Sequence, residues 1–358
     1  IVVNSNTTAT IASFNLSHAN DALRKSLARL SSGKRIVSPS DDAGGMAVAY
    51  KLNSKLKRTE AVRQNVQNGI SYLQVQDGAL STIAKIADRM SELRTMASDI
   101  TKNTGDVENY SKEFIELQRQ LNQIRHEKFN GISLFATSQS PATPTAPELR
   151  PPVDKQGMTL DESGRRYAKF SREILTSADG VRRDGHVSIN IVNLQYVLSI
   201  GQVDTRFIST ATATAANVTG QTAETINGRP VYVNLGNVDN GNQDDFGGSG
   251  TTANQEIYTS DGYMKSILFV SMGSFTDIIG RIADVRAENG AEQNRLNMTS
   301  ALLMQNQTNL EAAHGRIMDA DVALESTRFA RQNVLVQSSA AMVAQANQLT
   351  SIALQILG

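Results

Sequence analysis

The sequence predicts a mainly α protein whose two chain termini form a long antiparallel helical coiled-coil core, with a small β-containing outer domain inserted in the middle. Residues ~10–135 and ~265–357 carry apolar side chains at helical spacing, and unlike sequence lies between them. The C-terminal arm repeats its apolar residues at every seventh position, a seam that needs another helix to bury it. The N-terminal arm carries a stripe that can supply this partner.

The first helix is expected over ~10–31. Its apolar residues repeat every seven positions, at Leu16, Leu23 and Leu30. Gly33 is expected to end it, because a glycine after the last turn adopts the left-handed conformation at little cost. The turn at 38–42 (SPSDD) then offers Ser and Asp side chains that can cap a second helix.

The second helix is expected from Ala43 to ~101. Its apolar stripe consists of Val66, Ile70, Leu73, Leu80, Ile83, Ala87, Met90 and Leu93. A reversal at 104–106 (TGD) leads into a third helix over 108–128, which the sequence FNG at 129–131 ends.

The middle of the chain differs in composition. Five of the seven prolines lie between Pro141 and Pro152, interleaved with Ser, Thr and Ala, which is typical of an extended linker. Residues 186–191 (HVSINI) and 229–234 (RPVYVN) alternate polar and apolar side chains with the period of a β-strand. A small β-containing unit is therefore expected within 141–263.

The C-terminal arm is expected to begin near Met264, to break near Gly315 and to end in a helix over ~321–356. Its heptad positions are Phe275, Ile282, Asn289, Leu296, Leu303, Leu310 and Ile317, and those of the last helix are Leu335, Met342, Leu349 and Ile356. No Asp, Glu, Lys or Arg follows Arg331. A long uncharged helix that is apolar on most sides predicts a surface that is buried between subunits.

Two polar residues of this arm, Asn289 and Glu292, fall at seam positions. They can border a water-filled gap in an imperfect seam, or they can fix the register, as a single buried Asn does in a coiled coil. The sequence leaves both interpretations open, and neither implies catalysis.

Composition argues against several classes of function. Lys+Arg and Asp+Glu balance at 35 each, which disfavours a nucleic-acid or membrane partner held by bulk charge. The chain has no cysteine, and no apolar run is long enough to span a membrane. The four histidines are scattered, and the sequence offers no catalytic constellation, no metal site and no cofactor motif. We therefore expect a protein that is not an enzyme.

Several motifs resemble those of bacterial flagellins. Near the N-terminus they are residues 29–36 (RLSSGKRI), 41–49 (DDAGGMAVA), 65–73, 77–80 (DGAL) and 129–131 (FNG) with Leu134. Near the C-terminus they are residues 315–321 (GRIMDAD), Glu325 and 344–348 (AQANQ). The resemblance covers about 230 of the 358 residues, in the right order at both ends.

This resemblance implies a structural subunit that polymerises with itself into the hollow, extracellular filament of the bacterial flagellum, for motility. The inner core would comprise 1–43 and 319–358, the outer core 44–140 and 264–318, and the surface-exposed outer domain 141–263. The family leaves the cell through the flagellar type III export channel, so no cleavable secretory signal is expected.

The resemblance also implies partners besides the chain itself: a flagellar export chaperone and the cap and junction proteins. Flagellins sensed by a Toll-like receptor present an Arg, a Leu four residues later and a Glu on the adjacent helix; the matching positions are Arg89, Leu93 and Glu116. Arg and Leu at this spacing share a helix face, which suits such a contact. Alternatively, Arg89 is a solvated charge and Leu93 a seam residue.

Two alternatives for function stay open at the level of sequence. One is the hook–filament junction protein, which shares flagellin-like termini. The other is a flagellin whose outer insert acts as an adhesin or carries glycans, for which the Ser/Thr-rich segment 209–225 would be suited.

Overall fold

The computed structural model forms two compact units, which we call the terminal unit (Ile1–Ala61 with Leu303–Gly358) and the central unit (Val62–Leu302). The residues it describes are 6–136, 158–160, 166–168, 170–179, 185–200, 235–236, 259 and 262–357, with side chains except at 158–160, 166–168 and 349–357. Helices account for most of these residues, and the strands among them all lie in the middle of the chain. The predicted mainly α class is confirmed.

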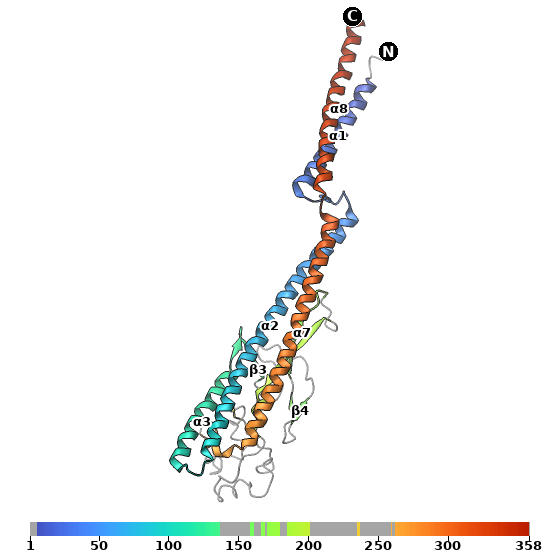
Figure 1. Ribbon diagram of the computed structural model, residues 1–358. Coiled ribbons are helices and arrows are strands. Elements are labelled where there is room, and N and C mark those ends of the chain that lie inside the picture. The colour runs from blue at the N-terminus through green and yellow to red at the C-terminus, as the bar shows by residue number, and fades with distance from the viewer. Residues whose placement is uncertain are drawn as a thin grey trace. The chain divides into compact units, whose positions relative to one another are not determined.

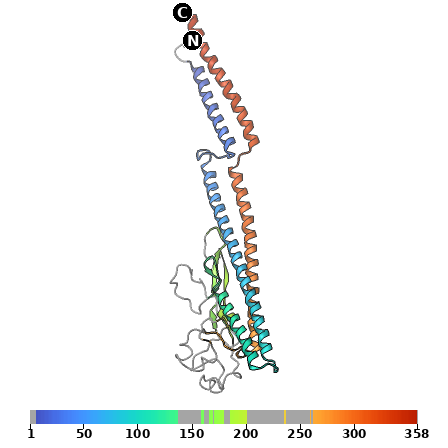
Figure 2. The ribbon, with the colours of Figure 1, turned by 90° about the vertical axis from the view of Figure 1, so that its left-hand side faces the viewer.

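The described part of the central unit is built on three long helices (Figures 1 and 2). Within this unit α2 (Ala43–Ala97) and α7 (Met272–Met318) lie side by side, and α3 (Thr104–Arg125) packs along α2. Arg286 of α7 donates from Nε to Asp77 of α2 at 2.9 Å. Arg89 of α2 donates from Nε to Glu113 of α3 at 2.8 Å. These pairs tie both neighbours to α2.

Large apolar side chains fill the core around α2. Every member of its predicted stripe is buried: Val66, Ile70, Leu73, Leu80, Ile83, Ala87, Met90 and Leu93. On α7 the buried heptad residues of this unit are Phe275, Ile282, Asn289 and Leu296. Burial of one large apolar side chain stabilises a fold by about 1.5–3 kcal/mol, so this seam dominates the stability of the central unit.

The polar seam residue Asn289 is buried and bonded to the opposite helix. Its Nδ2 donates to the backbone oxygen of Leu73 at 3.2 Å and to Oε1 of Gln76 at 3.4 Å, while Gln293 donates to its Oδ1 at 3.0 Å. A slip of α7 along α2 would bury these amide atoms without partners, which is costly. The geometry therefore favours register control over a water-filled gap.

The reversal between α2 and α3 differs from the expectation at both ends. Helix α2 ends at Ala97, about four residues early, and α3 already begins at Thr104. Asn103 accepts the amide of Asp106 at 2.9 Å, and the Asp106 carboxylate accepts the amide of Asn103 at 3.2 Å. This reciprocal pair is a capping box, so the segment expected to reverse the chain instead starts the helix.

Helix α3 ends at Arg125, before the expected position, because a hairpin follows it. Strand β1 (Lys128–Phe129) pairs antiparallel with β2 (Ile132–Ser133), and Asn130 and Gly131 between them have φ of 49° and 78°. Two consecutive positive φ values are typical of the type I′ turn, which Asn-Gly favours. The FNG motif is therefore a hairpin turn rather than a helix end.

The remaining elements of the middle of the chain are short. They are β3 (Phe135–Ala136), β4 (Met158–Leu160), β5 (Arg166–Ala168), β6 (Phe170–Leu175), β7 (His186–Asn193), α4 (Leu194–Val197) and the 3-10 helix η2 (Ile267–Phe269). One sheet has the order β3-β7-β6, with β7 parallel to β3 and antiparallel to β6, and β4 pairs antiparallel with β5. The strand predicted at 186–191 is confirmed, whereas 229–234 lies outside the described residues.

The strands supply part of the core of the central unit. Buried strand residues include Phe170, Val187, Ile189, Ile191 and Val192. Tyr72 and Gln76 of α2 donate to the backbone oxygen of Leu134 at 3.2 and 2.9 Å. Ile174 of β6 fills the space beside Gly69 of α2, where a Cβ would lie 2.2 Å from its Cδ1. The described part of the 141–263 region thus belongs to the same compact unit as the helices.

In the terminal unit, α1 (Thr7–Ser32) packs along α8 (Val322–Leu357), and the two helices run antiparallel (Figures 1 and 2). The Nδ2 of Asn6 donates to the backbone oxygen of Ala346 at 2.9 Å. Near the other end of the pair, the amide of Ala320 donates to the backbone oxygen of Gly33 at 2.9 Å. Gly33 has a φ of 68°, which confirms it as the glycine that ends α1.

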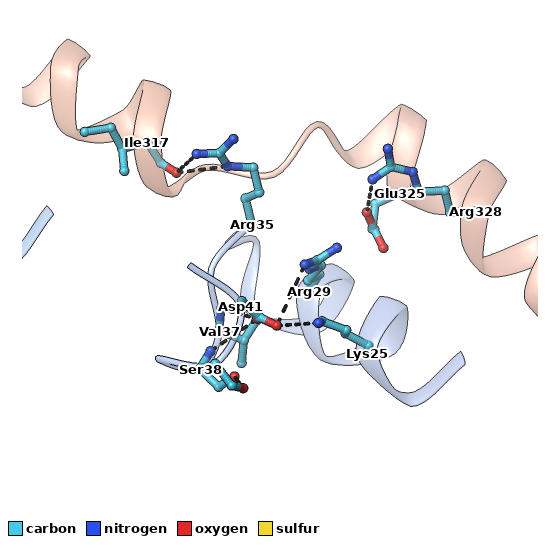
Figure 3. Close-up of polar contacts among 10 residues, drawn as sticks. Lys25, Arg29, Arg35, Val37, Ser38, Asp41, Ile317, Glu325 and Arg328 are labelled. Atoms are coloured by element: carbon cyan, nitrogen blue, oxygen red, sulfur yellow. Dashed lines mark hydrogen bonds and ion pairs between the residues drawn. The ribbon is translucent and has the colours of Figure 1, made fainter. Parts of the chain in front are cut away.

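Helix α7 ends in the terminal unit at Met318, three residues after Gly315, near which a break was expected. The guanidinium of Arg35 donates twice to the backbone oxygen of Ile317, at 2.9 and 3.1 Å (Figure 3). Next to this contact, Ile36 and Ala49 form a small buried cluster with Met318. The segment after α1 is thereby attached to the end of α7.

The link between α1 and α2 is organised around Asp41 (Figure 3). Its Oδ1 lies 2.6 Å from Lys25 Nζ, and its Oδ2 accepts the amides of Val37 and Ser38 at 3.2 and 3.4 Å. The bond from Lys25 is the main cause that lowers the pKa of Asp41 below its usual 3.8, and the two amides add to it against the effect of burial. Asp42 caps α2 through the amide of Gly45 at 2.8 Å.

Leu303→Asp should destabilise the folded monomer by roughly 3 kcal/mol, because it places an unpaired charge where the leucine is only 6% exposed. The neighbouring Leu302 is 57% exposed, so Leu302→Asp should change stability by less than about 0.5 kcal/mol. Thermal unfolding followed by circular dichroism measures both variants. Equal melting shifts would show that the seam does not bury Leu303.

Asp41→Asn should lower the stability of the terminal unit at neutral pH by on the order of 1 kcal/mol, because the charge that attracts Lys25 is lost. A carboxyl whose pKa is lowered by folding stabilises the fold at pH values above its pKa in the unfolded chain. This contribution disappears as the pH falls below about 4. The difference from the unchanged chain should therefore shrink in acid. Asp42→Asn is the control, since Asn caps a helix as well as Asp does. Urea unfolding at several pH values measures the free energy of unfolding of both variants. The same pH dependence in Asp41→Asn and Asp42→Asn would contradict the stabilising role of the Asp41 charge.

Candidate assembly surface

Small and polar side chains line the contact between α1 and α8. On α1 the buried residues are Ala12, Ala19 and Ser26, which are spaced by seven. Among the described side chains of α8 they are Glu325, Ser339 and Ala346, whose spacings are also multiples of seven. Alanine and serine bury far less apolar area than leucine, so these central positions contribute little to the stability of the pair.

Several large apolar side chains of the same two helices are exposed among those the structure describes. They are Ile11, Phe14 and Leu27 on α1, and Val322, Leu324, Val334, Leu335 and Met342 on α8. Phe14 is 65% exposed and Met342 is 54% exposed. Because an exposed apolar surface of this extent is rare in monomeric proteins, it indicates contact with a partner.

Acidic residues cap α8 and lie in its first turn. The Oδ1 of Asp321 accepts the amides of Ala323 and Leu324 at 3.0 and 3.1 Å, as an N-cap does. Glu325 follows in the first turn, where the helix dipole favours an acidic group, and its Oε2 accepts from Arg328 at 3.3 Å (Figure 3). After Arg331 the helix carries no charge, so its exposed side chains are polar or apolar but neutral.

Seven residues are predicted to pack subunits. Leu335 and Met342 are exposed, and Leu16, Leu23 and Leu30 are half-buried. The side chains of Leu349 and Ile356 lie outside the described part. The residues predicted for the helix seam lie inside the fold: Ile282, Leu296 and Leu303 are buried and Leu310 is half-buried. The structure of one chain does not test the subunit contacts, which stay a prediction.

The three residues matched to a receptor contact do not form one exposed patch. Leu93 is fully buried, as the alternative interpretation expected of a seam residue. Arg89 pairs with Glu92 at 3.0 Å and with Glu113 at 2.8 Å, and these two carboxylates raise its pKa above the usual value. Glu116 pairs with Arg119 on its own helix. Recognition by a receptor stays a prediction, and in this structure it would involve Arg89 and Glu116 without the Leu93 side chain.

Sequence reasoning did not single out the small residues at the α1–α8 contact. The signal was present, because Ala12, Ala19 and Ser26 repeat with the same period of seven as the leucines of α1. Leucine heptads draw attention because they are usually the buried positions of a helix pair. Here the Ala/Ser heptad of α1 is buried and its leucine heptad is half-buried, which only the packing of α1 on α8 shows.

Within the described residues, no group of three or more His, Asp or Glu side chains could hold a metal ion. Over the same part of the chain, none of the helices has the length and apolar character needed to cross a membrane.

Comparison with known proteins extends these observations. Residues 3–140 match the family model for the bacterial flagellin N-terminal helical region, and residues 272–357 match that for the C-terminal helical region. Flagellin FlaB2 of Treponema pallidum (strain Nichols) is 28% identical over 358 residues, with all of both chains covered. Polar flagellin F of Vibrio parahaemolyticus is 28% identical, again over the whole of both chains, and the flagellin of Bacillus subtilis is 28% identical over 96% of this chain and 95% of its own length.

The matches follow the architecture. The N-terminal family model spans α1, α2, α3 and the β1–β2 hairpin, and the C-terminal model spans α7 and α8. Together they match well over half of the chain, and the relatives carry the similarity through the strand-containing middle. The chain belongs to the bacterial flagellin family.

Proposed function

We propose that this chain is a structural subunit that polymerises with copies of itself into the extracellular filament of the bacterial flagellum, for motility. The observation that carries the proposal is the packing of α1 and α8, which leaves eight large apolar side chains of the described part exposed. Family membership supports it, since relatives that match this chain over its length bear the names flagellin and flagellar filament core protein.

The exposed residues are numerous enough to drive assembly. Transfer of one large apolar side chain from water stabilises a complex by about 1.5–3 kcal/mol, whereas association costs about 4–15 kcal/mol in lost freedom of motion. A contact between two chains must therefore bury several such side chains together. The eight exposed large apolar residues among the described side chains of α1 and α8 are enough to satisfy this condition.

The two helices also offer unlike surfaces. Phe14 and Ile11 on α1 differ in shape and position from Leu335 and Met342 on α8. We infer that a surface of one chain contacts a different surface of the next. Contacts between unlike surfaces do not close on themselves and generate helical polymers. We propose that residues 1–43 and 319–358 form the inner core of such a filament, and that 44–140 and 264–318 form the outer core.

Further partners follow from family resemblance. We propose that a flagellar export chaperone and the cap and junction proteins bind the apolar surface of the terminal unit, since it is the surface that assembly would otherwise bury. A role for the chain as the hook–filament junction protein is supported by no observation that favours it over the filament subunit. An adhesive or glycan-carrying insert would depend on residues 209–225, which lie outside the described part.

Leu335→Asp combined with Met342→Asp should abolish polymerisation, because each carboxylate would have to be buried between chains. The monomer should keep its helix content, since both side chains are already exposed. Seeded polymerisation followed by light scattering, with electron microscopy of the product, measures the effect. The control exchanges the two residues, as Leu335→Met with Met342→Leu, and should still polymerise. Normal filaments from the Asp variant would rule out this surface.

A further inference from the structure

Two carboxylates of α7 hold one residue of strand β7. Both oxygens of Glu292 accept the backbone amide of Asn190, at 2.8 and 3.0 Å. Glu288, one turn earlier on α7, accepts from the side-chain Nδ2 of the same Asn190 at 2.9 Å. Glu292 had been expected in the seam between helices, and its side chain instead reaches the sheet.

The position of Asn190 explains why an acceptor is needed there. Strand β7 pairs with β6 from His186 to Ile191, but β3 reaches only Val192 and Asn193 on the other side. The amide of Asn190 points toward that open side and would be an unpaired donor in a half-buried place, which costs about 1–3 kcal/mol. Glu292 thus supplies the acceptor that a neighbouring strand would have supplied.

The surroundings of Glu292 favour its protonated form. Burial is the main cause that raises its pKa from 4.5 to about 7, and the charge of Glu288 adds to the rise, while the amide of Asn190 and Arg295 lower it. On α2, Tyr72 is near enough for the charge of Glu292 to act on its hydroxyl. From β6, Arg172 lies 5.9 Å from the centre of the Tyr72 ring. Burial raises the pKa of Tyr72 to about 12, against the charge of Arg172 and with that of Glu292.

We propose that Glu292 is a proton-operated clamp, which holds β7 against α7 tightly when it is protonated and more loosely when it is ionised. An ionised carboxylate makes the stronger hydrogen bond to an amide, but here the cost of burying its charge exceeds that gain. The folded chain binds the proton more tightly than the unfolded one. The stabilisation is therefore complete below pH 4.5 and is lost as the pH rises through about 7.

The clamp concerns the folded monomer and does not depend on the proposed role in a filament. It links the attachment of the strand region to the acidity around the chain near neutral pH. Because β7 leads directly into α4, whose Leu194 and Val197 are buried, loosening at Asn190 would be transmitted to this part of the core. The hydrogen bonds from Tyr72 and Gln76 to the backbone oxygen of Leu134 involve no carboxylate and would stay in place.

Hydrogen exchange of the Asn190 amide in the full-length monomer tests the proposal. After correction for the intrinsic exchange rate, protection should fall by on the order of 50-fold between pH 5 and pH 8, as a shift of the pKa from 4.5 to about 7 requires. In Glu292→Gln, which accepts the same hydrogen bond without a charge, the change should be less than about 3-fold. Equal protection at both pH values in the unchanged chain, or a persistent pH dependence in Glu292→Gln, would overturn the clamp.

Two matched variants exclude other titrating groups. Asp284→Asn removes an exposed carboxylate from the same helix and should leave the pH dependence of the Asn190 amide intact. His186 begins β7 and lies 3.7 Å from Glu173, so His186→Gln tests whether its imidazole is the group responsible. Loss of the pH dependence in either variant would refute the assignment to Glu292. Carbon-13 titration of the Glu292 carboxyl in the unchanged chain gives a second measurement that does not depend on a variant; a midpoint near 4.5 contradicts the proposal and one near 7 supports it.

Discussion

The pairing of helices from opposite ends of the chain is the constraint on which the rest of the structure depends. In the terminal unit α1 packs along α8, and in the central unit α2 packs along α7, with Asn289 bonded to the backbone of Leu73. Isolated helices are marginally stable in water, so each gains its stability from a partner made hundreds of residues away. The strands, the hairpin and the capped reversal all take their places on this paired scaffold.

The two units satisfy the constraint in opposite ways. The central unit fully buries large side chains, such as Leu73, Leu80 and Phe275, and so has a large apolar core within one chain. The terminal unit buries Ala12, Ala19 and Ser339 and leaves Phe14 and Met342 in solvent. The same heptad periodicity thus accompanies a large apolar core in the central unit and an exposed apolar surface in the terminal unit. Filament assembly, as proposed, would bury that surface.

How much the sequence could predict depended on how local each signal was. The α2 stripe and Gly33 were recognised correctly, because a helical period and a glycine stop are local patterns. The start of α3 was misplaced, although the capping box of Asn103 and Asp106 is equally local and could have been found. By contrast, the contact of Glu292 with Asn190 spans 102 residues. No sequence pattern around Glu292 or Asn190 predicts this contact. The same holds for the contact of Ile174 with Gly69.

The sequence also could not predict which faces of α1 and α8 contact each other. Both Leu16 and Ala12 repeat with a period of seven, and periodicity alone does not say which row faces the partner helix. The answer depends on how closely the two backbones approach, which is a property of the pair and not of either helix. Small residues on both sides allow the close approach, and the leucines are then displaced to the flanks and the outer face.

The hydrogen bond from Asn6 to Ala346 joins residues 340 positions apart, and its consequence is kinetic. Closing a loop of that length costs little more at equilibrium than closing a shorter one, because the entropy grows only with the logarithm of the length. Folding rates, however, fall as contacting residues become more distant in the sequence. The α1–α8 pair is therefore among the last parts of the chain to form, and it cannot form before α8 is available. Until then the α1 segment lacks the partner that stabilises its helix, and its apolar side chains are free to contact another apolar surface.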